Sequence, residues 1–293
     1  GVGGGVVGFR TVILKMRLLK FFLLFFCSLH LASAQDGFNH TIFLNDQPYQ
    51  ILSERFSPPQ GFRRVTEDSV SFGAWLRRLP LLPENAPVKD YRNRIIKKAG
   101  DSTVAAVVAY DIKGRHLEQC MDILLRLWAE YLSIQGRQKA IQLPMPDGLM
   151  LSWTDWSAGK RPDLRGLNFY LQKNAAPDSS FRNFQRYLNT IFEYSGTQTF
   201  YHHYARIPAE AMQIGDFIVK KGRDGHAVII LDLVEDAAGN RRALIGQGDT
   251  PACQLYVLRY KVDDPWFPVD ISESVLPLPI KKKMRWEGLR RLE

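Results

Sequence analysis

Cysteine is scarce in this chain, which has three cysteines in 293 residues. Cys27 lies in an apolar run near the N-terminus, so Cys120 and Cys253 are the two that remain downstream. Two cysteines in so long a chain exclude a disulfide scaffold, in which several bridges replace a large hydrophobic core. Three roles stay open for Cys120: a buried core residue, a reactive thiol, or one half of a single bridge to Cys253.

Signatures of metal and nucleic-acid binding are also missing. The sequence contains neither an HExxH nor a CxxC pattern, which are spacings that hold a zinc ion. His202 and His203 are adjacent, and we expect them on a strand, where neighbouring side chains point to opposite faces. We therefore expect no metal and no cofactor. The basic residues form no stripe that would follow a phosphate backbone, so we expect no nucleic-acid partner.

The chain also lacks an apolar run of membrane-spanning length. The run that follows Met16 is too short for a convincing span, so we expect no integral membrane segment. A basic start, the apolar run and Ala32-Ser33-Ala34 are typical of a secretory signal peptide, with cleavage after Ala34. We expect residues 1–15 to be an upstream extension without a role in the fold, 16–34 to be the signal peptide and 35–293 to be a single secreted domain. The protein is then periplasmic, cell-surface or extracellular, and its lipid anchoring and oligomeric state stay open.

Basic residues outnumber acidic ones by 39 to 30, which gives a formal net charge of +9. Four of the basic residues and no acidic residue lie before residue 35, so the remainder of the chain carries a charge of +5. These residues are dispersed except for a C-terminal cluster, "KKKMRWEGLRR". The cluster is either a solvated tail or a site for anionic polymers of a cell envelope.

The order of the expected elements favours an α+β fold. Apolar residues at helical spacing predict two main helices, at about His116–Ile134 and Ser179–Tyr194. A β-branched strand is expected at Ser102–Ile112, and "GLMLSWTDWSAGKR" is expected to be a strand and a loop. The later segments "DFIVKK", "HAVIILDLV", "RRALIGQG" and "CQLYVLRY" predict an antiparallel meander. We therefore expect an antiparallel sheet packed against two main helices. Four charged residues of the first helical segment are expected on its exposed face: Glu118, Asp122, Arg126 and Glu130.

The segment "GDFIVKKGRDGHAVIILDL" raises the main functional question, because His226 follows Gly225 at the start of an expected strand. The neighbouring strand ends near Gln247. If the hairpin turns at residues 236–239, His226 and Gln247 are opposite one another, with Cβ atoms about 5 Å apart. The amide can then orient the imidazole ring. A slip of one residue would move Gln247 to the other face of the sheet.

Cys120 is the expected nucleophile for this pair. It lies near the N-terminus of the first predicted helix, where the helix dipole and a neighbouring imidazolium lower the pKa of a thiol. Thiol, imidazole and amide then take the roles of nucleophile, base and orienting group. His116, one helical turn before Cys120, is a weaker alternative for the base.

The sequence resembles two known groups of proteins. The region from "GDFIVKK" to "ALIGQG" resembles papain-like amidases and peptidases of the CHAP and NlpC types, which implies a papain-like fold with Cys120, His226 and Gln247 as catalytic residues. The context of the cysteine, "HLEQCMDILL", departs from the Asp-Cys or Glu-Cys that those enzymes normally have. Nearly the whole chain resembles a secreted Bacteroidetes family called domain of unknown function 4846, through segments such as "SFGAWLRRLPL", "WTDWSAGKR" and "GQGDTPACQLYVL". That resemblance implies an envelope or secreted protein and no particular activity.

A second group of residues suggests a binding surface. Trp153, Trp156 and Arg161 share one region, and aromatic rings beside an arginine suit sugar or peptide ligands. We therefore expect them to bind substrate, with ordinary core tryptophans as the alternative. The sequence thus favours a cysteine amidase or peptidase that acts on cell-wall peptides. The competing hypothesis is a non-catalytic envelope protein that binds a glycan, a peptide or another protein.

Overall fold

The computed structural model describes residues 1, 3, 50–112 and 115–293. The expected upstream extension and the signal peptide, with its cleavage position after Ala34, lie outside the described residues and stay predictions. The described residues from Gln50 onward belong to one compact unit. Among the residues that the structure describes, no helix has the length and apolar character needed to cross a bilayer.

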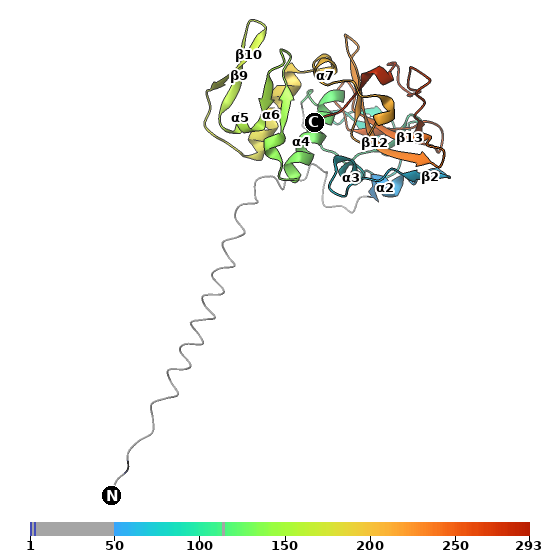
Figure 1. Cartoon of the computed structure of the whole chain (residues 1–293), viewed down its shortest axis with the longest axis horizontal. Helices are drawn as coiled ribbons and strands as arrows, with labels where there is room; N and C mark the ends of the chain where they lie inside the picture. The colour runs from blue at the N-terminus through green and yellow to red at the C-terminus, as the bar shows by residue number, and fades with distance from the viewer. Residues whose placement is uncertain (2, 4–49, 113–114) are drawn as a thin grey trace. The chain divides into compact units, whose positions relative to one another are not determined.

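An antiparallel sheet of eight strands is the largest in the described part of the chain (Figure 1). Its main path runs in the order β16–β11–β12–β13–β14–β6, with β2 paired to β12 and β15 to β13. The strands are β2 (Phe62–Arg64), β6 (Val104–Val107), β11 (Phe217–Lys220), β12 (His226–Asp236), β13 (Arg241–Gln247), β14 (Tyr256–Leu258), β15 (Phe267–Pro268) and β16 (Leu289–Arg290). The first nine residues of β12 are buried. This fits the apolar run from Ala227 to Leu231, which is typical of a strand covered on both faces.

Four small two-stranded sheets accompany the large one, all of them antiparallel. They pair β1 (Gln50–Ile51) with β3 (Pro80–Leu81), β4 (Val88–Lys89) with β5 (Ile95–Lys97), β7 (Gln142–Pro144) with β8 (Met150–Ser152), and β9 (Lys160–Arg165) with β10 (Asn168–Lys173). In Figure 1, β9 and β10 lie with α5 and α6 at one end of the compact unit, and β12, β13 and β2 lie at the other.

The helices are mostly short. They are α2 (Leu52–Arg55), α3 (Phe72–Leu76), α4 (Cys120–Ile134), α5 (Trp153–Ser157), α6 (Phe181–Tyr194) and α7 (Thr197–His203), with single 3₁₀ turns at η1 (Gln138–Ala140), η2 (Ala209–Ala211) and η3 (Trp286–Gly288). Helix α4 packs against β12 and α3, and α5 packs against α6. The described residues thus combine helices with antiparallel sheets, and the expected mixed α+β class is confirmed.

Several predicted boundaries are wrong. Helix α4 begins at Cys120, one turn later than predicted, because the backbone N–H of Gln119 donates to Asp122 Oδ2 at 3.0 Å and caps the helix there. The strand expected at Ser102–Ile112 is reduced to β6, and the expected loop after β8 begins with helix α5. His202 and His203 lie in α7 and not on a strand.

The charged face of the first helix is buried, which corrects the expectation that it is exposed. Arg126 is 3% exposed. Its guanidinium donates to Glu118 Oε2 at 2.6 Å and to Glu130 Oε1 at 2.8 Å. It also lies over the ring of Tyr110, with Cζ 4.2 Å from the ring centroid. These charges form an internal network on one side of α4.

The C-terminal basic cluster is folded onto the protein, so its interpretation as a solvated tail is wrong. Leu289 and Arg290 form β16, which pairs with β11. Met284 is fully buried. The guanidinium of Arg291 binds both carboxylate oxygens of buried Asp216, at 2.6 and 2.8 Å. The cluster thus closes one edge of the sheet, and its binding to anionic polymers stays a prediction.

Candidate active site

The hairpin of β12 and β13 sets the relation between His226 and Gln247. Its strands pair Glu235 with Arg241 near the turn, and Ile229 with Gly246 beyond a β-bulge. If this register continues to the end of the hairpin, the residue opposite His226 lies two positions beyond Gln247 in the chain. The predicted direct opposition is therefore wrong, but an offset of two residues keeps both side chains on the same face. Diagonal neighbours at this spacing are within reach of long side chains.

A short chain of hydrogen bonds orients the histidine. His226 Nε2 and Gln247 Oε1 are 2.7 Å apart. Gln247 Nε2 donates to the hydroxyl of Tyr256, which leaves Oε1 to accept from the imidazole. In this arrangement Nε2 of His226 carries the proton and Nδ1 carries the lone pair. Nδ1 is buried and has no hydrogen-bond partner among the described residues.

The electrostatics keep this imidazole neutral. Burial lowers the pKa of His226 below its ordinary value of 6.5, and the bond to Gln247 opposes that effect. His226 and Gln247 are each 1% exposed. A neutral imidazole with an unoccupied Nδ1 lone pair is the form that accepts a proton.

Cys120 starts helix α4 directly beside the two strands. An ideal Cβ on Gly248 would lie 2.6 Å from Ile123 Cδ1 and 3.6 Å from the Cα atom of Cys120, so a glycine after Gln247 lets the helix approach closely. The backbone N–H of Ala227, the residue after His226, bonds to the Cys120 sulfur and lowers its pKa. The structure therefore brings the helix start to the residues that follow both His226 and Gln247.

The thiol is not acidified, which corrects the expectation of a lowered pKa. Cys120 is 5% exposed. Burial raises the pKa of its thiol to about 11, although the Ala227 N–H and Lys282 act in the opposite direction. Both Cys120 and Cys253 are free thiols, so the alternative of a bridge between them is wrong. Burial therefore favours the neutral form of both the Cys120 thiol and the His226 imidazole in the resting protein.

A cleft of about 380 Å³ opens at the start of α4. Cys120 and Gly225 line it, whereas the buried side chains of His226 and Gln247 do not. Gln119 also lines the cleft, and its Oε1 accepts from the hydroxyl of Thr250 at 2.8 Å. The remaining lining comes from the following residues: Met121, Asp122, Phe192, Ser195, Gly196, Thr197, Gly222, Arg223, Asp224, Thr250 and Lys282.

His116, the alternative base, is engaged elsewhere. Its ring stacks on Tyr91, with centroids 5.0 Å apart and planes 12° apart. Its Nδ1 accepts from the backbone N–H of Ala252 at 3.2 Å. His116 therefore serves the packing of the segment before α4, and it does not line the cleft at Cys120.

Trp153, Trp156 and Arg161 come together but do not form an open platform. Both indoles are buried, and both rings pack edge-on against Tyr187 of α6. The guanidinium of Arg161 lies over Trp156, with Cζ 3.9 Å from the ring centroid. Trp156 Nε1 donates to Asn183 Oδ1 at 3.0 Å. Their role in substrate binding stays a prediction, and this geometry favours the alternative of core packing.

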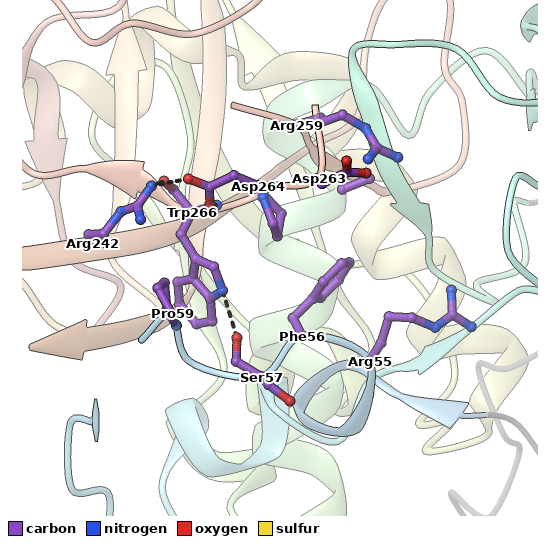
Figure 2. Close-up of a pocket in the computed structure, with 11 residues that line it drawn as sticks. Arg55, Phe56, Ser57, Pro59, Arg242, Arg259, Asp263, Asp264 and Trp266 are labelled. Carbon is purple, nitrogen blue, oxygen red and sulfur yellow. Dashed lines mark hydrogen bonds and ion pairs between the residues drawn. The ribbon is translucent and has the colours of Figure 1, made fainter. Parts of the chain in front are cut away.

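A second cleft, of about 350 Å³, contains aromatic and charged residues of α2, β13 and the loops before β15 (Figure 2). Figure 2 shows Arg242 bound to Asp264, and the Trp266 indole donating to the Ser57 carbonyl at 3.0 Å. Arg259 donates to the carbonyl of Val104 at 2.9 Å. These polar groups hold the surrounding loops together, and the lining contains neither cysteine nor histidine. The cleft at Cys120 is therefore the better candidate for chemistry.

Within the described part of the chain, no group of three or more His, Cys, Asp or Glu side chains is arranged to hold a metal ion.

Four residues of the site escaped the sequence analysis. Tyr256 and Gly248 lie in or beside segments that were singled out for other reasons, and only the fold shows that they support Gln247 and α4. Lys282 belongs to the basic C-terminal cluster, far from the other residues in sequence. Gln119 had a usable signal, because an amide immediately before a nucleophilic cysteine is well placed to bind the reacting carbonyl oxygen.

A family model described as "Domain of unknown function (4846)" matches residues 52–286. Neither a curated protein nor a solved structure matches the chain.

Proposed function

The chain belongs to the family described as domain of unknown function 4846, since the match spans residues 52–286, and we propose that it is a papain-like cysteine amidase or peptidase. Its substrates are peptides of the cell wall, which it meets after export. Export is supported by the signal-peptide pattern that ends at Ala34, and the substrate class by the resemblance to cell-wall amidases. The catalytic assignment is supported by the geometry at the start of α4.

One observation carries the proposal: the buried Nδ1 of His226 lacks a hydrogen-bond partner among the described residues. An unsatisfied polar atom in a protein interior costs free energy, so its retention needs an explanation. The bond to Gln247 occupies the other ring nitrogen, and the Cys120 sulfur lies beside the backbone of the next residue, Ala227. A role as the general base for Cys120 explains why this lone pair is left free.

The reaction starts from a neutral thiol and a neutral imidazole. The Cys120 sulfur attacks the carbonyl carbon of the amide while His226 Nδ1 takes the thiol proton. His226 then gives that proton to the leaving amine nitrogen, the C–N bond breaks, and a thioester remains on Cys120. Water, activated by the same Nδ1, hydrolyses the thioester and restores the thiol. Gln247 holds the ring through each step.

The developing oxyanion has two donors near the helix start. The backbone N–H of Cys120, at the first helical position, has no acceptor within the helix. The side-chain Oε1 of Gln119 accepts from Thr250, and its Nε2 has no acceptor among the described residues. Donors that are already in place stabilise the charge of the transition state without reorganising.

We expect Cys120→Ala and His226→Ala to lower the rate of amide hydrolysis at least about 10³-fold, because each removes a group that acts in the bond-breaking step. The measurement is mass-spectrometric detection of new amines and carboxylates when the purified full chain digests peptides released from cell walls. Cys253→Ala is the matched control, since it removes the other buried cysteine, and it should retain activity. Full activity in Cys120→Ala would overturn the proposal.

A non-catalytic envelope binding protein is the second candidate, and the burial of the thiol favours it. Cys120 is 5% exposed and its pKa is about 11, which is the condition of an inert core cysteine. In this case wild type and Cys120→Ala bind the same wall peptides with equal affinity and neither hydrolyses them. Isothermal titration with both proteins, followed by mass analysis of the titrated peptide, separates the two functions.

A further inference from the structure

Lys282 brings a positive charge to the cleft at Cys120. It lines the cleft together with Cys120, and its Nζ lies 3.5 Å from the carbonyl oxygen of Gly225, the residue before His226. The C-terminal segment that carries it is held in place by buried Met284 and by the pairing of β16 with β11. The fold therefore holds the backbone of this lysine in place.

The ammonium group of Lys282 is only partly satisfied. It has three N–H donors, and its one hydrogen bond in the described structure is the long one to Gly225. No carboxylate of the described residues forms an ion pair with it. The side chain is half-buried, so solvent screens its charge less than that of a fully exposed lysine.

The other charged groups that line the cleft form no ion pair with Lys282. Arg223 and Asp224 are both exposed, are adjacent in sequence and have opposite signs. The carboxyl group of Asp122 accepts from the backbone N–H of Gln119, and burial raises its pKa well above the ordinary value. The Lys282 ammonium, which forms no ion pair with a described carboxylate, thus lies in the cleft that Cys120 lines.

We propose that Lys282 makes this cleft selective for amides that carry a carboxylate next to the scissile bond. The inference rests on the proposed function, because it assigns the specificity of the same site. A substrate carboxylate replaces the water around the ammonium and accepts the two hydrogen bonds that Gly225 leaves available. The lysine also acts on the reacting groups themselves, because its charge lowers the pKa values of both Cys120 and His226.

The test compares two alkylating reagents that differ in charge, anionic iodoacetate and neutral iodoacetamide, on full-length protein with Cys253→Ala. The ratio of their rates at Cys120 reports the local potential independently of the thiol pKa, since both reagents consume the same thiolate. We expect Lys282→Gln to lower this ratio about 3- to 10-fold at low salt. Lys282→Arg should preserve it, and Lys283→Gln, which removes an exposed charge one residue away, should leave it unchanged.

The outcomes separate this inference from the proposed function. If neither reagent labels Cys120 in the folded protein, the cysteine is inert and both proposals are overturned. If both reagents label it and the ratio is the same in Lys282→Gln as in the parent, the enzyme proposal stands and the role of Lys282 is overturned. With substrates, we expect Lys282→Gln to raise KM about 10-fold for a peptide with a free carboxylate beside the scissile amide and to leave KM unchanged for its carboxamide analogue.

Discussion

The hydrogen bonds among His226, Gln247 and Tyr256 show how two side chains define the protonation state of a third. Tyr256 binds the Nε2 atom of Gln247, so the amide presents Oε1 to His226. The histidine therefore carries its proton on Nε2 and leaves Nδ1 as the acceptor. Positioning residues of this kind never touch a substrate, yet they decide which atom of the catalytic residue is basic.

Substitution of Gln247 tests this positioning role. Gln247→Glu introduces a carboxylate that stabilises the imidazolium and raises the pKa of His226. Because the reaction needs neutral His226, we expect the acidic limb of the kcat/KM profile to move about 1–2 pH units higher. Gln247→Ala should lower kcat roughly 10²-fold without that shift. If the acidic limb stays in place in Gln247→Glu while the folded structure is retained, Gln247 has only a structural role.

Helix α4 shows where the charge pattern of an element misleads. The spacing of Asp122, Arg126 and Glu130 is that of an exposed helical stripe, yet all three residues are buried. The helix is contacted by β12, α3 and η1, so more than one of its sides is covered. A buried charge is tolerated only when it is paired, and Arg126 supplies the pairing for carboxylates on both sides.

We expect Arg126→Ala to destabilise the protein by about 3–5 kcal/mol, because it leaves buried carboxylates without their counter-charge. Urea unfolding followed by circular dichroism measures this change in the free energy of unfolding. Arg137→Ala is the matched control, since that arginine is exposed just after the same helix, and it should change stability by less than about 0.5 kcal/mol. Equal effects of the two substitutions would show that the network contributes no stability.

At the scale of the whole molecule, the candidate site is a meeting point of distant segments. Gln119 and Cys120 come from the start of α4, His226 and Gln247 from the central hairpin, and Lys282 from the segment that leads to β16. Folding therefore creates the protonation states of the site, since none of these groups is buried in an unfolded chain. The pH dependence of stability should report this directly.

We expect stability to fall on both sides of neutral pH. The folded protein holds the pKa of His226 below 6.5, so the unfolded chain takes up this proton first and stability declines as pH falls through that region. Burial raises the pKa of Cys120 from 9.0 to about 11, so the unfolded chain loses this proton first and stability declines as pH rises from about 9 to 11.

Cys120→Ala isolates the alkaline contribution. We expect it to remove about 2–3 kcal/mol of the stability loss between pH 9 and 11, because the residue that ionises preferentially in the unfolded chain is gone. Urea unfolding of wild type and Cys120→Ala at a series of pH values measures the difference. Parallel curves for the two proteins above pH 9 would mean that the thiol is not held in its neutral form by the fold.

Much of the local structure was predictable from the sequence by itself, because it depends on residues close together in the chain. The apolar spacing of α6, the β12–β13 hairpin, the mixed α+β class and the family all follow from such patterns. The sequence also singled out Cys120, His226 and Gln247, whose catalytic role stays a prediction. The predicted register was wrong, but His226 and Gln247 still lie on the same face of the sheet. Side chains alternate between the two faces along a strand, so an offset of two residues leaves them on the same side.

Only the tertiary structure decided how these residues relate to one another and to solvent. The bulge in β12 set the diagonal contact of His226 with Gln247, and the covering of α4 turned an apparently exposed charged face inward. Burial raised the pKa of the Cys120 thiol, where the helix dipole and a neighbouring imidazolium predicted a lower value. The C-terminal segment packs back against the sheet through the pairing of β16 with β11, and this brings Lys282 to the cleft. Each of these outcomes depends on what a distant segment covers, and local periodicity carries no information about that.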